Sequence, residues 1–116
     1  MRDRGLKGEA LAISYLKKKG YKILEKNYRT KFGEIDIIAS KDDVVVFIEV
    51  KTRSTDAFGA PEESVTTEKQ ERIKKAALYY LKNLRTIPAL RFDVISILYP
   101  VKLKQEPQIE HIEHAF

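Results

Sequence analysis

The sequence contains no cysteine, only two histidines, and neither a Gly-rich phosphate loop nor a Ser-His-Asp set. Without cysteine, disulfides, thiolate zinc sites, iron–sulfur clusters and a cysteine nucleophile are excluded. The absence of a phosphate loop argues against the use of nucleoside triphosphates. Any catalysis must therefore depend on oxygen and nitrogen groups.

Long apolar runs are missing as well. The longest covers residues 44–48, far short of the roughly 20 residues that a membrane-spanning helix needs. The N-terminal sequence Met1-Arg2-Asp3-Arg4-Gly5 has no apolar secretory region. We therefore expect a cytoplasmic protein without a membrane partner. The length of 116 residues leaves room for one hydrophobic core, which predicts a single domain over residues 1–116.

Positive charge exceeds negative charge, with 22 Lys and Arg against 17 Asp and Glu and a net charge of +5. Such an excess suits a polyanionic partner, although many solvated proteins are equally basic. The basic groups are spread over the first two-thirds of the chain, whereas Glu106, Glu110 and Glu113 make the C-terminal region acidic. We expect one basic face that includes Lys17-Lys18-Lys19, Arg29, Lys31, Lys51, Arg53, Lys69, Arg72, Lys74 and Lys75.

Apolar periodicity predicts two helices and five strands. Helical spacing and Gly20 as a C-cap indicate a helix over residues 5–19, and a second helix is expected from Thr67, with Gln70 completing a capping box. Its apolar stripe is expected to extend to Leu84, and Tyr79-Tyr80 is interpreted as a surface ring beside a core ring. Strands are expected over residues 21–28, 34–39, 44–51, 91–99 and 108–116, with a loop over residues 54–66. The order α-β-β-β-α-β-β predicts a mixed sheet with helices packed against it.

Acidic residues interrupt two of these strands, Gly33-Glu34-Ile35-Asp36-Ile37-Ile38-Ala39 and Val44-Val45-Val46-Phe47-Ile48-Glu49-Val50-Lys51. Apart from Glu34, Asp36, Glu49 and Lys51, these runs are apolar on both faces, as in central strands. The short connection Lys41-Asp42-Asp43 predicts an antiparallel hairpin, which brings the charged residues together. Carboxylates packed this closely repel one another, and a divalent cation such as Mg²⁺ would relieve the repulsion and activate water at a phosphate.

The spacing by itself leaves two hypotheses open. Asp36 and Glu49, which are separated by twelve intervening residues, can together with Lys51 place two metal ligands and a cation around one scissile phosphate. The same residues can equally form a structural ion-pair cluster, in which Lys51 and Arg53 neutralise the acids without metal.

The motifs resemble those of the YraN family of predicted endonucleases, which is distantly similar to archaeal Holliday-junction resolvases and to the PD-(D/E)xK nuclease superfamily. The matching segments are Gly5-Leu6-Lys7-Gly8-Glu9 with Ala12 and Tyr15-Leu16, Asn27-Tyr28-Arg29, Gly33 to Ala39, Phe47-Ile48-Glu49-Val50-Lys51-Thr52-Arg53, Lys69 with Arg72-Ile73, and Arg91-Phe92-Asp93-Val94. The superfamily's proline before the aspartate is replaced by Ile35. The resemblance implies an α/β, restriction-endonuclease-like fold with a mixed central sheet flanked by helices.

The resemblance also implies a role for each matching residue. Asp36 and Glu49 would hold Mg²⁺ or Mn²⁺ with the main-chain carbonyl of Val50, and Lys51 would orient the attacking water or stabilise the pentavalent phosphate. Glu9 would complete the acidic cluster; the alternative is a solvated helix residue.

Further residues are expected around this centre. Glu34 is expected to pair with Arg29 or Arg53, and Lys69 and Gln70 either face the site or act as ordinary capping and solvated residues. Lys74 and Lys75 are expected to contact nucleic acid.

Three hypotheses follow for function. The first is a metal-dependent endonuclease acting on DNA, including branched or flapped DNA; the second is a non-catalytic nucleic-acid-binding module with the nuclease fold; the third is the structural ion-pair protein. A homodimer is one candidate for the oligomeric state.

Overall fold

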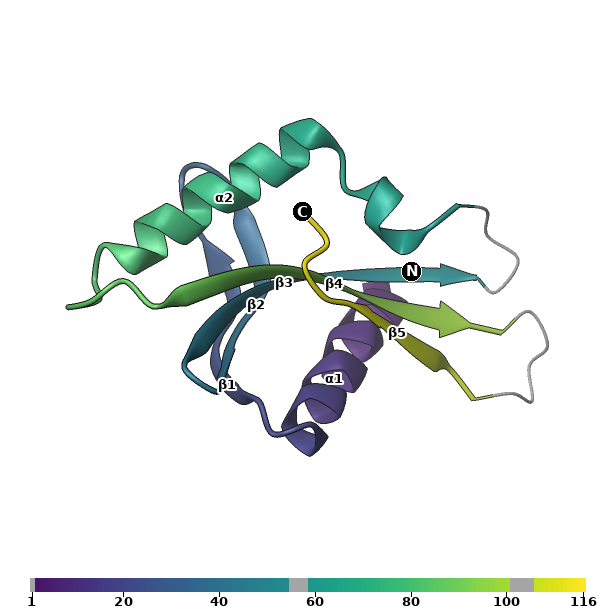
Figure 1. Cartoon of the computed structure of the whole chain (residues 1–116). Helices are drawn as coiled ribbons and strands as arrows, with labels where there is room; N and C mark the ends of the chain where they lie inside the picture. The colour runs from purple at the N-terminus through teal and green to yellow at the C-terminus, as the bar shows by residue number, and fades with distance from the viewer. Residues whose placement is uncertain (1, 55–58, 101–105) are drawn as a thin grey trace.

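The computed structural model describes residues 2–54, 59–100 and 106–116, which form a five-stranded sheet with a helix on each face (Figure 1). The elements are α1 (Arg2–Lys18), β1 (Lys22–Arg29), β2 (Glu34–Lys41), β3 (Val44–Ser54), the short 3-10 helix η1 (Pro61–Ser64), α2 (Thr67–Leu81), β4 (Ala89–Tyr99) and β5 (Gln108–Ile112). The predicted element order and mixed α/β class are confirmed.

The strands lie in the order β1-β2-β3-β4-β5, so the strands that carry the acidic residues are central. The neighbours β3 and β4 are parallel, and the other three pairs are antiparallel. A parallel pair needs a crossover connection, and α2 lies within the connection from β3 to β4. The predicted hairpin between β2 and β3 is confirmed, with a ladder that runs from Lys41↔Val44 to Ile37↔Ile48.

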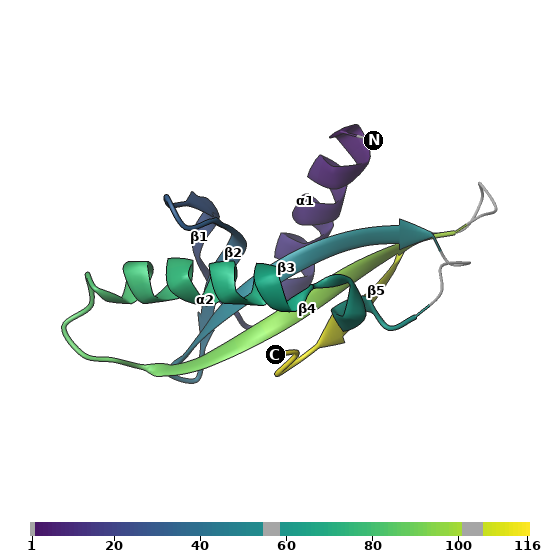
Figure 2. The same ribbon diagram turned by 90° about the horizontal axis from the view of Figure 1, so that it is seen from above.

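Each face of the sheet has its own apolar core, because side chains alternate along a strand. Phe47 and Val94 pack against Ile73 and Ala77 of α2, whereas Ile48 and Ile95 pack in the cluster that contains Ala12 of α1. The turned view shows α1 and α2 on opposite sides of the sheet (Figure 2). This two-sided covering explains why the central strands are apolar on both faces.

Several predicted boundaries differ from the structure. The second helix is capped by Thr66, whose side chain accepts a hydrogen bond from the Lys69 N–H, and it ends at Leu81, so Leu84 lies outside it. The amide of Gln70 donates instead to the Val65 carbonyl. The predicted loop over residues 54–66 contains η1, and its residues 55–58 lie outside the described part. The last strand stops at Ile112, because Glu113 and His114 turn and the Ala115 N–H donates to the Phe92 carbonyl.

Neither helix, over the residues that the structure describes, is long and apolar enough to cross a membrane.

Candidate active site

Asp36 and Glu49 lie just beyond the last paired residues of the hairpin of β2 and β3. Their strands stop pairing after Ile37↔Ile48, and the Val50 N–H donates to Asp36 Oδ2 at 2.8 Å. A side-chain carboxylate therefore takes the place of the next main-chain acceptor. Asp36 and Glu49 line a cavity of about 380 Å³ together with Gly33, Glu34, Lys69, Arg72 and Ile73.

Burial and the proximity of the two acids make it unfavourable for both carboxyl groups to be ionised. Burial, followed by the neighbouring charge of Glu49, raises the pKa of Asp36 to about 7, despite the opposing hydrogen bond from Val50. Burial and the charges of Glu34 and Glu49 likewise raise the pKa of Glu9. The Asp36 carboxyl group therefore releases its proton near neutral pH, and a cation in the cavity would favour that release.

Two lysines contact Glu49, which is 6% exposed. Lys69 Nζ of α2 lies 2.7 Å from Glu49 Oε1, and Lys51 Nζ lies 3.8 Å from the same atom. Burial and the adjacent Lys69 lower the pKa of Lys51. Burial would lower the pKa of Lys69 too, but its hydrogen bonds with Glu49 and Lys51 outweigh burial and raise it. The two ammonium groups therefore differ: Lys69 holds its proton firmly, and Lys51 gives it up more readily.

Glu9 belongs to α1, which packs on the face of the sheet opposite to α2 (Figure 2). It is not among the residues that line the cavity. Asn27 connects it to the hairpin: with its amide nitrogen turned toward the acids, Asn27 donates to Glu9 Oε1 at 2.8 Å and to Glu34 Oε1 at 3.2 Å. Asn27 has a φ of 50° in the middle of β1, a conformation that asparagine tolerates better than most residues. Sequence reasoning gave Asn27 no role, although an asparagine inside a strand pattern was a usable signal.

Of the other predicted residues, Arg29 pairs with an acid near the cavity, whereas Lys74 and Lys75 lie away from it. Glu34 was expected to pair with Arg29 or Arg53, and Arg29 Nε lies 3.6 Å from Glu34 Oε2. The guanidinium of Arg53 donates to the Gly59 carbonyl. The exposed side chains of Lys74 and Lys75 lie on α2 outside the cavity lining. The ion-pair hypothesis named Lys51 and Arg53 as partners of the acids, but Lys69 makes the closest contact recorded for Glu49.

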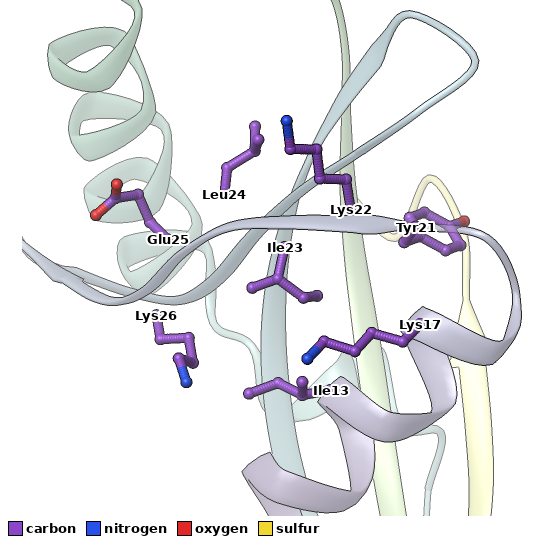
Figure 3. Close-up of a pocket in the computed structure, with 8 residues that line it drawn as sticks. All are labelled: Ile13, Lys17, Tyr21, Lys22, Ile23, Leu24, Glu25 and Lys26. Carbon is purple, nitrogen blue, oxygen red and sulfur yellow. The ribbon is translucent and has the colours of Figure 1, made fainter.

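A larger hollow of about 590 Å³ lies between α1 and β1. Figure 3 shows Ile13 and Lys17 of α1 projecting toward Ile23 and Lys26 of β1, while the carboxylate of Glu25 projects to the other side of the strand. The lining of this hollow consists of aliphatic groups, lysines, one tyrosine and a single carboxylate, that of Glu25. It offers none of the paired carboxylates that the smaller cavity has, so the smaller cavity is the better candidate for chemistry.

The donor types in the smaller cavity suit a hard divalent cation. Mg²⁺ usually takes one or two carboxylates from a protein and fills its remaining positions with water and substrate phosphate oxygens. Asp36 and Glu49 provide two such carboxylates, and burial of both makes a cation favourable. Within the described residues, no three His, Cys, Asp or Glu side chains are arranged around one metal position. A main-chain oxygen, Glu34 in the cavity lining or a movement of Glu9 could provide a third ligand.

A protein-family model described as "Uncharacterised protein family UPF0102" matches residues 8–97. A UPF0102 protein of Syntrophomonas wolfei is 52% identical over 116 residues, covering 99% of this chain and 98% of the relative. A second, from Thermodesulfovibrio yellowstonii, is 55% identical and covers 98% and 96%. A third, from Clostridium perfringens, is 54% identical and covers 97% and 92%. The similarity therefore extends over essentially the whole of each protein.

Proposed function

The chain belongs to the uncharacterised protein family UPF0102, and we propose that it is a metal-dependent nuclease that hydrolyses phosphodiester bonds in DNA. This family is the YraN family that the sequence motifs resembled. The observation that carries the proposal is the shared cavity of Asp36 and Glu49, in which burial and mutual repulsion raise the pKa of Asp36 to about 7.

The proposed chemistry gives roles to the two cavity acids and to residues near them. Asp36 and Glu49 would hold Mg²⁺ or Mn²⁺, with the Val50 carbonyl and Glu9 as further ligands. Such a cation, when bound, lowers the pKa of water and stabilises charge on a phosphate oxygen. The hydrogen bond from the Val50 N–H keeps the Asp36 carboxylate turned toward the hairpin opening.

Lys51 is suited to the attacking water. Its pKa is lowered by burial and by Lys69, so it can accept and release a proton more easily than an exposed lysine. In its ammonium form it also lies close enough to the acids to stabilise negative charge on a phosphate beside them. Lys69 pairs with Glu49 at 2.7 Å, and Asn27 holds Glu9 near the acids.

One observation favours the non-catalytic alternative, a nucleic-acid-binding module that retains the fold. The 2.7 Å contact between Lys69 and Glu49 already neutralises one of the two acids. If this ion pair persists in solution in the presence of Mg²⁺, the basic face can bind DNA without turnover.

A cleavage screen with a metal titration separates these functions. Purified protein would be incubated with linear, flapped and four-way DNA at increasing Mn²⁺ or Mg²⁺, beside the Asp36→Ala and Glu49→Ala variants. The nuclease proposal expects metal-dependent cleavage of at least one substrate that both variants lose. DNA binding without cleavage at any metal concentration would support the binding module.

A further inference from the structure

Two exposed aromatic rings lie beside the acidic cavity. Phe32, in the turn between β1 and β2, is 38% exposed, and Tyr79 on α2 is 42% exposed. Their ring centroids are 6.4 Å apart at an interplanar angle of 61°. The next residue after Phe32 is Gly33, which lines the cavity with Arg72. The two rings therefore form an apolar surface at the border of the proposed catalytic centre.

The turn that carries Phe32 is held by its own hydrogen bonds. The Thr30 hydroxyl accepts from the main-chain N–H groups of Phe32 and Gly33, at 3.0 and 3.2 Å, and the Thr30 N–H donates to the Gly33 carbonyl at 2.9 Å. The turn also packs closely on α2, because a Cβ atom added at Gly33 would lie 3.3 Å from Arg72 Cβ. An exposed ring is thus held in place without being used to fill the core.

Lysines accompany both rings. Lys31 Nζ lies 5.3 Å from the centre of the Phe32 ring, and Lys82 Nζ lies 5.6 Å from that of Tyr79. On α2, the exposed side chains of Arg72, Lys75 and Tyr79 follow one another at helical spacing, and Lys82 continues the series. A basic stripe containing one aromatic ring therefore leads away from the cavity. A platform for stacking combined with nearby cations is the way proteins bind single-stranded nucleic acid.

We propose that Phe32 and Tyr79 form a stacking platform for an unpaired nucleobase next to the cavity, so that the preferred substrate is DNA with a single-stranded segment beside the cleavage point. This inference rests on the proposed function and specifies its substrate class. Tyr80, the neighbour of Tyr79, takes no part, because it packs against Phe47 and Tyr28 in the core.

Equilibrium binding in EDTA tests the platform without cleavage. The probes are a fluorescent blunt duplex and the same duplex with a single-stranded flap. We expect Phe32→Ala and Tyr79→Ala each to weaken flap binding about tenfold, the effect of losing one stacked base, and to change duplex binding less than twofold. Leu78→Ala is the matched control, since Leu78 is 63% exposed on the same helix and carries no ring. It should leave both affinities unchanged.

A spectroscopic arm reports stacking directly. The chain contains no tryptophan, so Phe32→Trp introduces a single indole at the platform. Flapped DNA should quench the fluorescence of this indole, and blunt duplex should quench it much less. The Phe32→Trp variant should also regain the affinity for flapped DNA that Phe32→Ala loses.

The possible failures are distinguishable. If the wild-type protein binds neither DNA, the proposed function fails and the platform with it. If it binds both and the alanine variants bind the flap as tightly as the wild type, the platform alone is wrong. If these variants instead change the sedimentation behaviour of the protein while flap binding stays intact, the rings belong to a protein interface and the inference is overturned.

Discussion

Lys69 Nζ lies 2.7 Å from Glu49 Oε1, 1.1 Å closer than Lys51 Nζ, although Lys51 is only two residues from Glu49 along the same strand. A strand places residues two apart on the same face but about 7 Å apart along its length. The helix α2, packed on that face, instead brings Lys69 directly over the carboxylate. Glu49 therefore has a close counter-ion with which a bound cation would compete.

Replacing Lys69 by Met should tighten divalent-cation binding. The variant removes the competing ammonium from Glu49, and about a threefold to tenfold lower dissociation constant for Mn²⁺ is expected from charge effects of this size. Isothermal titration calorimetry measures it. Lys74→Met is the matched control, an exposed lysine on the same helix outside the cavity lining, and it should leave the affinity unchanged. Weaker Mn²⁺ binding by Lys69→Met would show that the ion pair does not compete with metal.

Asp36→Asn should remove a pH dependence of stability. Because the pKa of Asp36 is raised from 3.8 to about 7 on folding, the folded state binds more protons than the unfolded state between those values. Its contribution to stability is thus fully present below pH 4 and is lost as pH rises toward 7, at up to about 1.4 kcal/mol per pH unit.

Urea unfolding of metal-free protein from pH 4 to pH 8 measures this slope by comparison with the variant. As pH rises over that range, the wild type should lose unfolding free energy relative to Asp36→Asn, because the asparagine does not ionise. A difference that does not change with pH would place the Asp36 pKa near its ordinary value.

Lys51→Ala should separate turnover from binding. Loss of a group that stabilises charge in the transition state typically lowers turnover by about 100-fold or more. DNA affinity should change less than about threefold, because one partly buried ammonium contributes little to a binding mode dominated by backbone contacts. Single-turnover cleavage and fluorescence anisotropy measure the two quantities. An unchanged cleavage rate would mean that the activity comes from a contaminant or another site.

DNA binding should weaken steeply with salt. Lys and Arg contacts to phosphates release condensed counterions, so each contact on duplex DNA adds about −0.9 to the slope of log K against log salt. Four to six contacts would give a slope of about −4 to −5. The double variant Lys74→Glu and Lys75→Glu should lower affinity and flatten the slope, with Glu110→Gln on β5 as the control. An affinity independent of salt would contradict binding led by the DNA backbone.

Asp93→Ala should destabilise the fold more than any change in the cavity. Asp93 is fully buried, accepts three hydrogen bonds from Arg91, and lies 2.7 Å from His111 Nε2. Burial alone would raise the pKa of Asp93, but its bonds with His111 and Arg91 lower it. Breaking a buried ion pair on one side costs about 3–5 kcal/mol. Chemical unfolding measures the loss, and the exposed Glu110→Ala should change stability by less than about 0.5 kcal/mol.

The amino-acid sequence by itself determined the order of the elements, the hairpin of the two acidic strands and the approach of Asp36 to Glu49. These features are local: apolar periodicity distinguishes helices from strands, and a short connection between two strands leaves them few ways to pair other than side by side. The family could also be identified from the sequence, because a motif match depends on residue types and their spacing along the chain and not on the positions of the residues in space.

The tertiary structure decided which distant groups reach the acids. The family resemblance had pointed to Glu9 and, as one alternative, to Lys69, but not to Asn27. Their approach depends on how α2, β1 and α1 pack against the opened end of the hairpin. The pairing of Asp93 with His111 likewise follows from β5 lying beside β4. No periodicity encodes such contacts, because they depend on the relative placement of elements that are far apart in the chain, and burial then sets the pKa values of the groups that meet.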